Sequence, residues 1–481
     1  MRPQPGSLPS MTKVLSKIVD VRTQELRALG LAFVFNFVVL GSYYVVRPIR
    51  DNIGAEGGLE NLSWMFTGTL VAMLIANALF SAIVARMSRR RFIPIAYRFF
   101  IANLVLFYLL MRTLTAAQNV WVGRAFYVWV SVFNLFIVTV FWAFMTDVFN
   151  SDQGKRLFGF ISVGGTLGGI VGATITASLV RKIGALNLLF VSAVMLELGA
   201  WCVRFFPAEF KGRHREATSD EAITNEAPTD AKVSQESPED FSRTGNADAE
   251  KPIGGGIISG ISHVFSSPYL LGICAFMLLH AITSTLVYFQ QADITAHQFH
   301  ERAARTAFFA QIDLSVNLLT IGVQLFLTGR LLKWFGVGLT LAFLPVLSMI
   351  GFLAMGFVPV LALLAIFQTL RRAGNFAVTR PAREVLFTVL RREDKYKAKS
   401  FIDTFVYRAG DQIGAWSYPL LTWLGLGLTG ISFVAAPLAA IWCVLSLWLG
   451  RKQVAFARAQ ERLGAPDISD IAPPLDKPSA A

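Results

Sequence analysis

Apolar runs of about 20 residues recur along this whole chain, and no other feature constrains its fold as strongly. A helix of ~20 apolar residues crosses the ~30 Å hydrocarbon core of a bilayer. Runs such as 29–46 and 420–449 are apolar on every side, whereas a barrel strand would alternate over ~10 residues. Charged residues make up only 16% of the 481 residues, below the ~25% of soluble domains. We therefore predict an all-α polytopic membrane protein.

The apolar runs predict twelve transmembrane helices, six before residue 208 and six after residue 266. We expect them at 28–47, 62–85, 92–112, 122–148, 157–180, 184–207, 267–291, 306–330, 337–357, 360–388, 399–425 and 429–450. The polar stretch 211–250 has almost no large apolar residues and is predicted to be a disordered linker. The expected organisation is an N-terminal segment 1–27, a bundle 28–207, a linker 208–266, a bundle 267–450 and a tail 451–481.

The distribution of Lys and Arg predicts the orientation. Basic residues gather in the N-terminal segment, in the loop Arg86–Arg91 and at the start of the tail, Arg451-Lys452. Cytoplasmic loops carry this excess, so we expect both termini and the linker in the cytoplasm of a multi-pass bacterial inner-membrane protein. The same rule accounts for the net charge of +13, which leaves membrane lipid as a partner and predicts no nucleic-acid partner.

Similar residues recur in the two halves at a nearly constant spacing. Asp51 and Asp293 are 242 positions apart, and so are the segments Phe144–Asp147 and Leu386–Val389. A six-helix unit that repeats in one orientation is typical of major-facilitator carriers, whose site lies near the midplane between the halves. We therefore predict two pseudo-repeated six-helix bundles, which is a major-facilitator-like architecture.

Charged residues inside the predicted spans are functional candidates, because burying a charge in a bilayer is unfavourable. In span 360–388, Arg371 and Arg372 fall near mid-bilayer, and Arg372, Asn375, Thr379 and Arg383 recur at helical spacing. Guanidinium groups form two-pronged hydrogen bonds to phosphate or carboxylate, although pairing with Asp or Glu is the alternative. The predicted substrate-binding residues are Arg371, Arg372, Asn375, Arg47, Arg50, Arg380, Arg383, Tyr407 and Arg408.

Buried acids are the candidates for coupling or gating. Asp313 and Asn317 lie at i and i+4 in span 306–330. Asp403 and Asp411 share a predicted face with Tyr407 in span 399–425, and Asp411 has either Arg408 or an arginine of span 360–388 within reach. A buried carboxylate serves proton coupling or structural pairing, and the sequence favours neither.

Several kinds of chemistry leave no trace in the sequence. We find no Walker loop, no paired catalytic carboxylates, no Cys/His cluster and no nucleophile elbow. The three cysteines all fall inside apolar runs. We therefore predict a protein that is not an enzyme and that has no cofactor and no metal site. Without a P-loop, any transport would be secondary.

Three segments resemble the bacterial branch of the nucleotide (ATP/ADP) translocase family, whose non-mitochondrial carriers are related to the major facilitators. They are Tyr43–Asp51 (YYVVRPIRD), Thr379–Thr388 (TRPAREVLFT) and Lys395–Asp403 (KYKAKSFID). The resemblance covers nearly the whole chain except the linker and the tails. It implies twelve helices, exchange of a nucleotide or a similar compound, and an important basic residue near the end of helix one, which Arg47 or Arg50 matches.

Three functional hypotheses follow from these features. The leading one is a secondary transporter that moves an anionic solute by alternating access, with a nucleotide or another phosphorylated compound as the first candidate. The second is a proton-coupled exporter of amphipathic compounds, with protons as partner, which would use Asp313, Asp411 and the aromatic-rich spans of a chain with 40 phenylalanines. The third is a non-transporting membrane protein that recruits partners through its linker.

Overall fold

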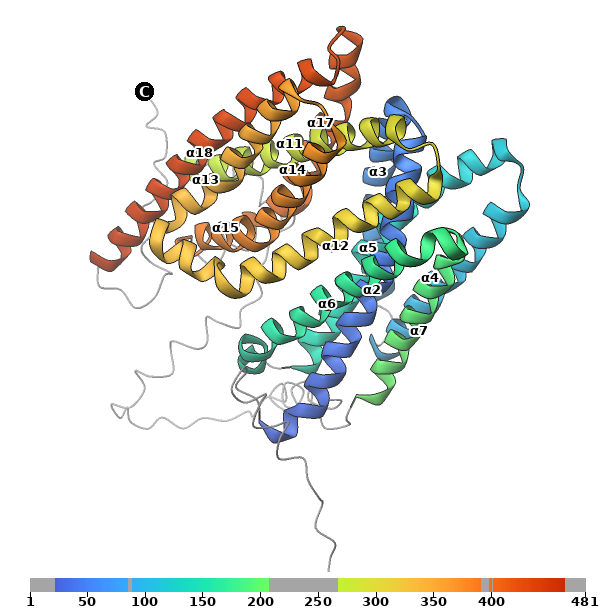
Figure 1. The fold of residues 1–481 in the computed structure, drawn as a ribbon. Helices are drawn as coiled ribbons and strands as arrows, with labels where there is room; N and C mark the ends of the chain where they lie inside the picture. Colours follow the sequence, from blue (N-terminus) through green and yellow to red (C-terminus); the bar gives the residue numbers. More distant parts are fainter. Residues whose placement is uncertain are drawn as a thin grey trace, which may run out of the picture.

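Two bundles of helices make up the protein, which was analysed as a computed structural model describing residues 22–84, 89–149, 151–206, 267–390, 398–399 and 401–462. In Figure 1 the first bundle runs from blue to green and the second from yellow to red. The predicted linker 208–266 lies outside the described residues, as do residues 1–21 and 463–481. All regular elements in the described ranges are helical.

The helices of the first bundle follow a short 3-10 turn, η1 (Thr23–Glu25). They are α2 (Leu26–Glu56), α3 (Leu59–Val84), α4 (Arg89–Thr113), α5 (Ala116–Val148), α6 (Ser151–Ile183) and α7 (Leu188–Phe205). Each overlaps one predicted span. Helix α2 runs nine residues beyond the predicted end, because Pro48 lies inside the helix without breaking it. Arg47, Arg50 and Asp51 therefore all lie on one continuous helix.

The second bundle holds α11 (Pro268–Gln298), α12 (Arg302–Phe326), α13 (Thr328–Phe357) and α18 (Leu428–Arg462). Two further spans are interrupted by π-helical turns. One consists of α14 (Leu361–Gly374), η4 (Asn375–Thr379) and α15 (Arg380–Leu386), and the other of η5 (Ile402–Val406) and α17 (Tyr407–Trp423). The described residues thus confirm helices at all twelve predicted spans.

Length and composition separate these spans into two groups. Ten helices in the described ranges are long and apolar enough to cross a membrane. The exceptions are the two spans with π-helical turns, which also carry most of the charged candidates. A π-turn closes i→i+5 hydrogen bonds and rotates the residues that follow it relative to a regular α-helix. The regular spacing that we assumed from Arg372 to Arg383, and from Asp403 to Asp411, is therefore interrupted.

Glycines bring the first and fifth helices of each bundle into close contact. A Cβ atom on Gly168 of α6 would collide with the backbone carbonyl of Phe37 on α2. A Cβ on Gly410 of α17 would lie 2.9 Å from the backbone carbonyl of Leu278 on α11. Gly410 follows Gly168 by 242 positions, which is the spacing of the predicted repeat. Small residues thus allow close helix packing in span 157–180, and the second bundle repeats this packing.

Glu25 fixes the beginning of α2 to the beginning of α6. Its carboxylate is buried, at 3% exposed, and accepts hydrogen bonds from Gln153 Nε2 at 2.8 Å and Arg156 Nη2 at 3.1 Å. Burial alone would raise the pKa of Glu25. Hydrogen bonds from Gln153, the Arg22 backbone and Arg156 outweigh burial and lower this pKa below its ordinary value of 4.5. Glu25 is therefore held as a carboxylate at neutral pH.

Candidate functional site

The two bundles meet at the end where α2 passes into α3 and α11 passes into α12. Arg302 Nε donates to Glu56 Oε1 at 2.8 Å, and Ser63 Oγ donates to the Ala415 carbonyl at 2.6 Å. Helix contacts between the bundles join α2 with α11 and α12, α3 with α17, and α6 with α12. Within the described ranges, α5 forms no comparable contact with α14 or α15. The protein is therefore closed at the α2–α3 end.

A chain of hydrogen bonds links three helices beneath this closure. Arg50 Nη2 on α2 donates to Tyr127 Oη on α5 at 3.1 Å, and Tyr127 Oη donates to Tyr288 Oη on α11 at 3.2 Å. Tyr288 Oη in turn donates to Asp51 Oδ1 at 2.9 Å. The Arg50 guanidinium also lies 4.4 Å from the centre of the Tyr127 ring. This chain begins and ends on α2, so it ties the first bundle to α11 of the second.

Asp313 on α12 lies between two arginines from different bundles. Its side chain is 1% exposed, with Arg372 Nη2 of α14 at 2.7 Å and Arg47 Nη1 of α2 at 3.3 Å. Neither carboxylate oxygen meets hydrogen-bond geometry with these groups, so charge attraction holds them together. Asn317 lies beside this group, but its amide donates to the Asp313 backbone carbonyl at 2.8 Å. Of the two predicted residues on this helix, Asp313 alone pairs with the candidate arginines.

Arg371 points into the second bundle instead of across the interface. Its guanidinium donates to Ser284 Oγ at 2.9 Å, and more weakly to Thr283 Oγ1 and the His280 carbonyl, both at 3.4 Å. The residue is 2% exposed. All three acceptors are neutral groups of α11, and no carboxylate among the described residues forms an ion pair with Arg371. Its charge is therefore buried without an opposite charge.

Arg380 and Arg383 differ in their partners, although both lie on α15. Arg383 Nη2 lies 3.3 Å from Asp403 Oδ1, which joins α15 to η5. The Arg380 guanidinium lies 4.8 Å from the centre of the Phe376 ring and has no ion pair within the described ranges. Arg380 interacts electrostatically with Tyr407 and, across the interface, with Tyr44. Arg380 is therefore the second candidate arginine that forms no ion pair with an acid within the described ranges.

Asp411 on α17 pairs with Arg408 on the same helix. Arg408 Nη1 donates to Asp411 Oδ2 at 3.1 Å, and Thr285 Oγ1 of α11 donates to Asp411 Oδ1 at 3.3 Å. The first of the two alternatives left by the sequence, pairing at i+3, is therefore present. The Arg408 guanidinium also lies 5.8 Å from the centre of the Tyr407 ring.

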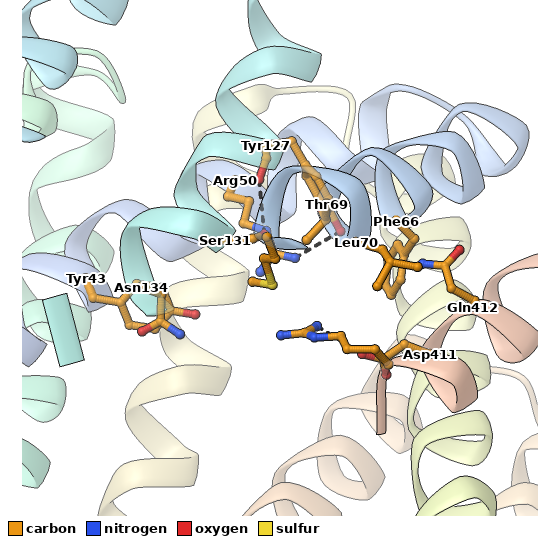
Figure 2. Close-up of a pocket in the computed structure, with 12 residues that line it drawn as sticks. Tyr43, Arg50, Phe66, Thr69, Leu70, Tyr127, Ser131, Asn134, Asp411 and Gln412 are labelled. Carbon is orange, nitrogen blue, oxygen red and sulfur yellow. Dashed lines mark hydrogen bonds and ion pairs between the residues drawn. The ribbon is translucent and has the colours of Figure 1, made fainter. Parts of the chain in front are cut away.

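A pocket lies between the bundles below the closed end, with a volume of ≈ 110 Å³. Figure 2 shows Arg50 and Tyr127 on one side of the pocket and Asp411 and Gln412 on the other. The pocket is lined by Tyr43, Arg50, Phe66, Thr69, Leu70, Met73, Tyr127, Ser131, Asn134, Arg408, Asp411 and Gln412. Of the predicted residues, Arg50, Arg408 and Asp411 line it. The others lie outside this lining.

Tyr127 is the residue that sequence reasoning missed. It lies within a run of aromatic residues, VGRAFYVWV, where a tyrosine looks like one more packing residue. Its hydroxyl nevertheless contacts both Arg50 and Tyr288, and its ring lines the pocket. The available signal was a polar hydroxyl inside a predicted span, since buried Tyr O–H groups usually find a hydrogen-bond partner.

Positive charge dominates among the predicted site residues and their acidic partners. The groups described above include seven arginines and four aspartates, which leaves three positive charges in excess. The arginines are Arg47, Arg50, Arg371, Arg372, Arg380, Arg383 and Arg408, and the aspartates are Asp51, Asp313, Asp403 and Asp411. In a low-dielectric interior such an excess attracts an anion.

Comparisons with known proteins agree with this architecture. A family model described as Major Facilitator Superfamily matches residues 29–381. The search of curated proteins found no match.

Solved structures share the fold at low sequence identity. A POT family transporter in complex with 5-aminolevulinic acid aligns with a TM-score of 0.58 at 11% identity, over 89% of this chain and 96% of that chain. A D-xylose-proton symporter aligns with a TM-score of 0.57 at 11% identity, over 88% and 97%. The xylose transporter XylE from E. coli, in an inward-open conformation, aligns with a TM-score of 0.55 at 12% identity, over 86% and 94%.

Proposed function

This chain belongs to the Major Facilitator Superfamily, and we propose that within this family of secondary transporters it carries a small anion bearing phosphate or carboxylate groups. The observation that carries the proposal is the excess of positive charge in the pocket, whose lining holds two arginines, Arg50 and Arg408, and one acid, Asp411. Guanidinium groups bind phosphate and carboxylate through two parallel hydrogen bonds. A neutral sugar or a cation would gain nothing from this excess.

A phosphorylated compound such as a nucleotide is our first candidate substrate. The support is the resemblance of residues 43–51, 379–388 and 395–403 to the nucleotide translocases. The comparisons with known proteins establish only the superfamily and do not bear on this narrower family. Two groups of the pocket fit such a substrate, because Arg50 and Arg408 come from opposite bundles and Tyr127 and Phe66 offer aromatic faces. A phosphate between Arg50 and Arg408 would draw the bundles together, as alternating access requires.

We infer that the closed end faces the outside of the cell, and that this conformation therefore faces inward. The inference rests on the positive-inside rule, which predicts both termini in the cytoplasm of a bacterial inner-membrane protein. Helix α2 starts on the terminal side and ends at the closure. Epitope tags at residue 230 and at the C-terminus should both report cytoplasm, and a periplasmic signal from either tag would contradict this orientation.

Counterflow in proteoliposomes tests the substrate. Vesicles loaded with an unlabelled nucleotide, a sugar phosphate or a dicarboxylate should accumulate the labelled form of the transported anion. Arg408→Gln should reduce this uptake strongly. The matched control is Arg98→Gln, because Arg98 pairs with Glu197 at 2.9 Å outside the pocket. Uptake of neutral solutes alone, or equal loss in both variants, would overturn the proposal.

Proton coupling is the second candidate, and the buried carboxylates Asp313 and Asp411 favour it. Both lie beside arginines that a bound anion could occupy instead, which would leave the carboxylate free to take a proton. A structural neighbour is a proton symporter by its title. Uptake driven by an imposed pH gradient without counter-substrate would support coupling. Uptake that needs a counter-substrate at every pH would support exchange.

A further inference from the structure

A second cavity opens on the outer face of the first bundle, between α3 and α5. Its volume is ≈ 890 Å³, and its lining is largely apolar. It is lined by Asn61, Trp64, Met65, Ala72, Ile75, Ala76, Trp121, Arg124, Ala125, Val128, Trp129 and Val132, none of which lines the central pocket. Trp64, Trp121 and Ile75 are each more than half exposed, so the cavity faces the bilayer.

One charged residue, Arg124, lies in this apolar cavity. Its guanidinium carbon is 4.6 Å from the centre of the Trp121 ring, and its Nε is buried without a hydrogen-bond partner. Within the described ranges no carboxylate forms an ion pair with it. A charge that faces lipid without a partner is unfavourable, so an anion from outside the chain would complete this site.

The position of Arg124 along α5 gives its depth in the membrane. Helix α5 begins at Ala116, so Arg124 lies about 12 Å along it at ~1.5 Å per residue. The 33 residues of α5 span about 50 Å, roughly 10 Å more at each end than the ~30 Å hydrocarbon core. Arg124 therefore lies near the boundary between headgroups and acyl chains, where Trp64 and Trp121 also fit.

We propose that this cavity binds one anionic phospholipid, with its phosphate on Arg124 and an acyl chain along α3 and α5. Ala72 and Ala76 of α3 and Val132 of α5 lie deeper in the membrane than Arg124 along their helices. Their small or branched apolar side chains form the groove for the chain. The site therefore offers a cation at headgroup level and an apolar groove below it, which matches the two ends of a phospholipid.

The site borders the seam between the bundles. Trp64 packs edge-on against Trp416 of α17, with ring centres 5.0 Å apart, and Trp416 Nε1 donates to Thr67 Oγ1 at 3.1 Å. A lipid that holds Trp64 in place therefore stabilises the closed end. An effect on this conformation is expected in addition to simple retention of the lipid.

Lipid retention by the full-length protein tests the proposal. The protein is extracted from nanodiscs of phosphatidylcholine with a minor fraction of phosphatidylglycerol, and the bound lipid is counted by native mass spectrometry. Wild type should retain phosphatidylglycerol in preference. Arg124→Ala should lower this retention roughly tenfold, the value of one charge-assisted hydrogen bond. The matched control is Arg112→Ala. Arg112 is an exposed arginine at the end of α4, which adjoins the start of α5 where Arg124 lies.

A second variant and a soluble competitor keep the result interpretable. Ala76→Trp fills the groove while it leaves Arg124 in place, so it should also release the lipid. Excess inorganic phosphate should not displace the lipid from wild type. Equal retention in wild type and Arg124→Ala, full displacement by inorganic phosphate, or full retention in a folded Ala76→Trp protein would each overturn the proposal.

Discussion

Removing Arg372 should destabilise the protein through the acid that it leaves behind. Asp313 is 1% exposed and lies 2.7 Å from Arg372 and 3.3 Å from Arg47. At an effective dielectric constant of ~20, the attraction over 2.7 Å is about 6 kcal/mol, much of which desolvation offsets. Breaking a buried pair by removing one partner costs ~3–5 kcal/mol. Because Arg47 remains, we expect about 3 kcal/mol for Arg372→Ala.

The double variant separates pairing from substrate binding. Arg372→Ala with Asp313→Asn removes both charges, so most of the lost stability should return. If Arg372 binds the transported anion, affinity for the anion should not return, because its guanidinium is still missing. The measurements are unfolding by SDS and anion binding, both for wild type, the two single variants and the double variant. A loss of about 3 kcal/mol corresponds to a roughly hundredfold lower ratio of folded to unfolded protein.

Two results would refute this reasoning. If the double variant is no more stable than Arg372→Ala, the buried charge of Asp313 is not the cause of the instability. If Arg372→Ala binds the anion as wild type does, Arg372 has a purely structural role and the anion site lies with the other arginines. Arg372→Lys offers a further check, since it keeps the charge but loses the planar fork, so binding should recover only in part.

Three further predictions address the closure, the packing and the start of α2. Tyr288→Phe removes the hydrogen bond to Asp51, worth ~1 kcal/mol, so the closed end should open about fivefold more often. Spin-label distances between α3 and α12 measure this opening, and an unchanged distance distribution would contradict the prediction. Gly168→Ala should lower stability by about 1–3 kcal/mol in SDS unfolding, whereas Gly159→Ala on the same helix, where a Cβ meets nothing within 4 Å, should be nearly neutral. Glu25→Gln should destabilise the protein at neutral pH, and the difference in unfolding free energy from wild type should shrink as the pH falls below 4.5. The reason is that a group with a lowered pKa contributes stability only while its carboxylate is ionised. A difference that does not change with pH would exclude this origin.

The sequence determined the class and the outline of this protein. Apolar runs long enough to cross a bilayer leave helices as the only way to satisfy the backbone in lipid, so twelve spans could be counted from composition alone. The repeat also left a trace, since residues such as Asp51 and Asp293 recur 242 positions apart. Arginines in apolar runs stood out because the bilayer makes a charge there unfavourable.

Tertiary structure alone decided which partner each charged residue takes. Arg371 and Arg372 are neighbours in sequence, yet one binds hydroxyl groups of α11 and the other pairs with Asp313 of α12. Adjacent helical residues point about 100° apart, and only the packing of α14 against its neighbours sets what lies in each direction. The π-helical turn after Gly374 was equally hidden, because its sequence carries no local signal that separates it from an α-helix. The link from Arg50 through Tyr127 and Tyr288 joins residues that are up to 238 positions apart, so it exists only in the folded chain.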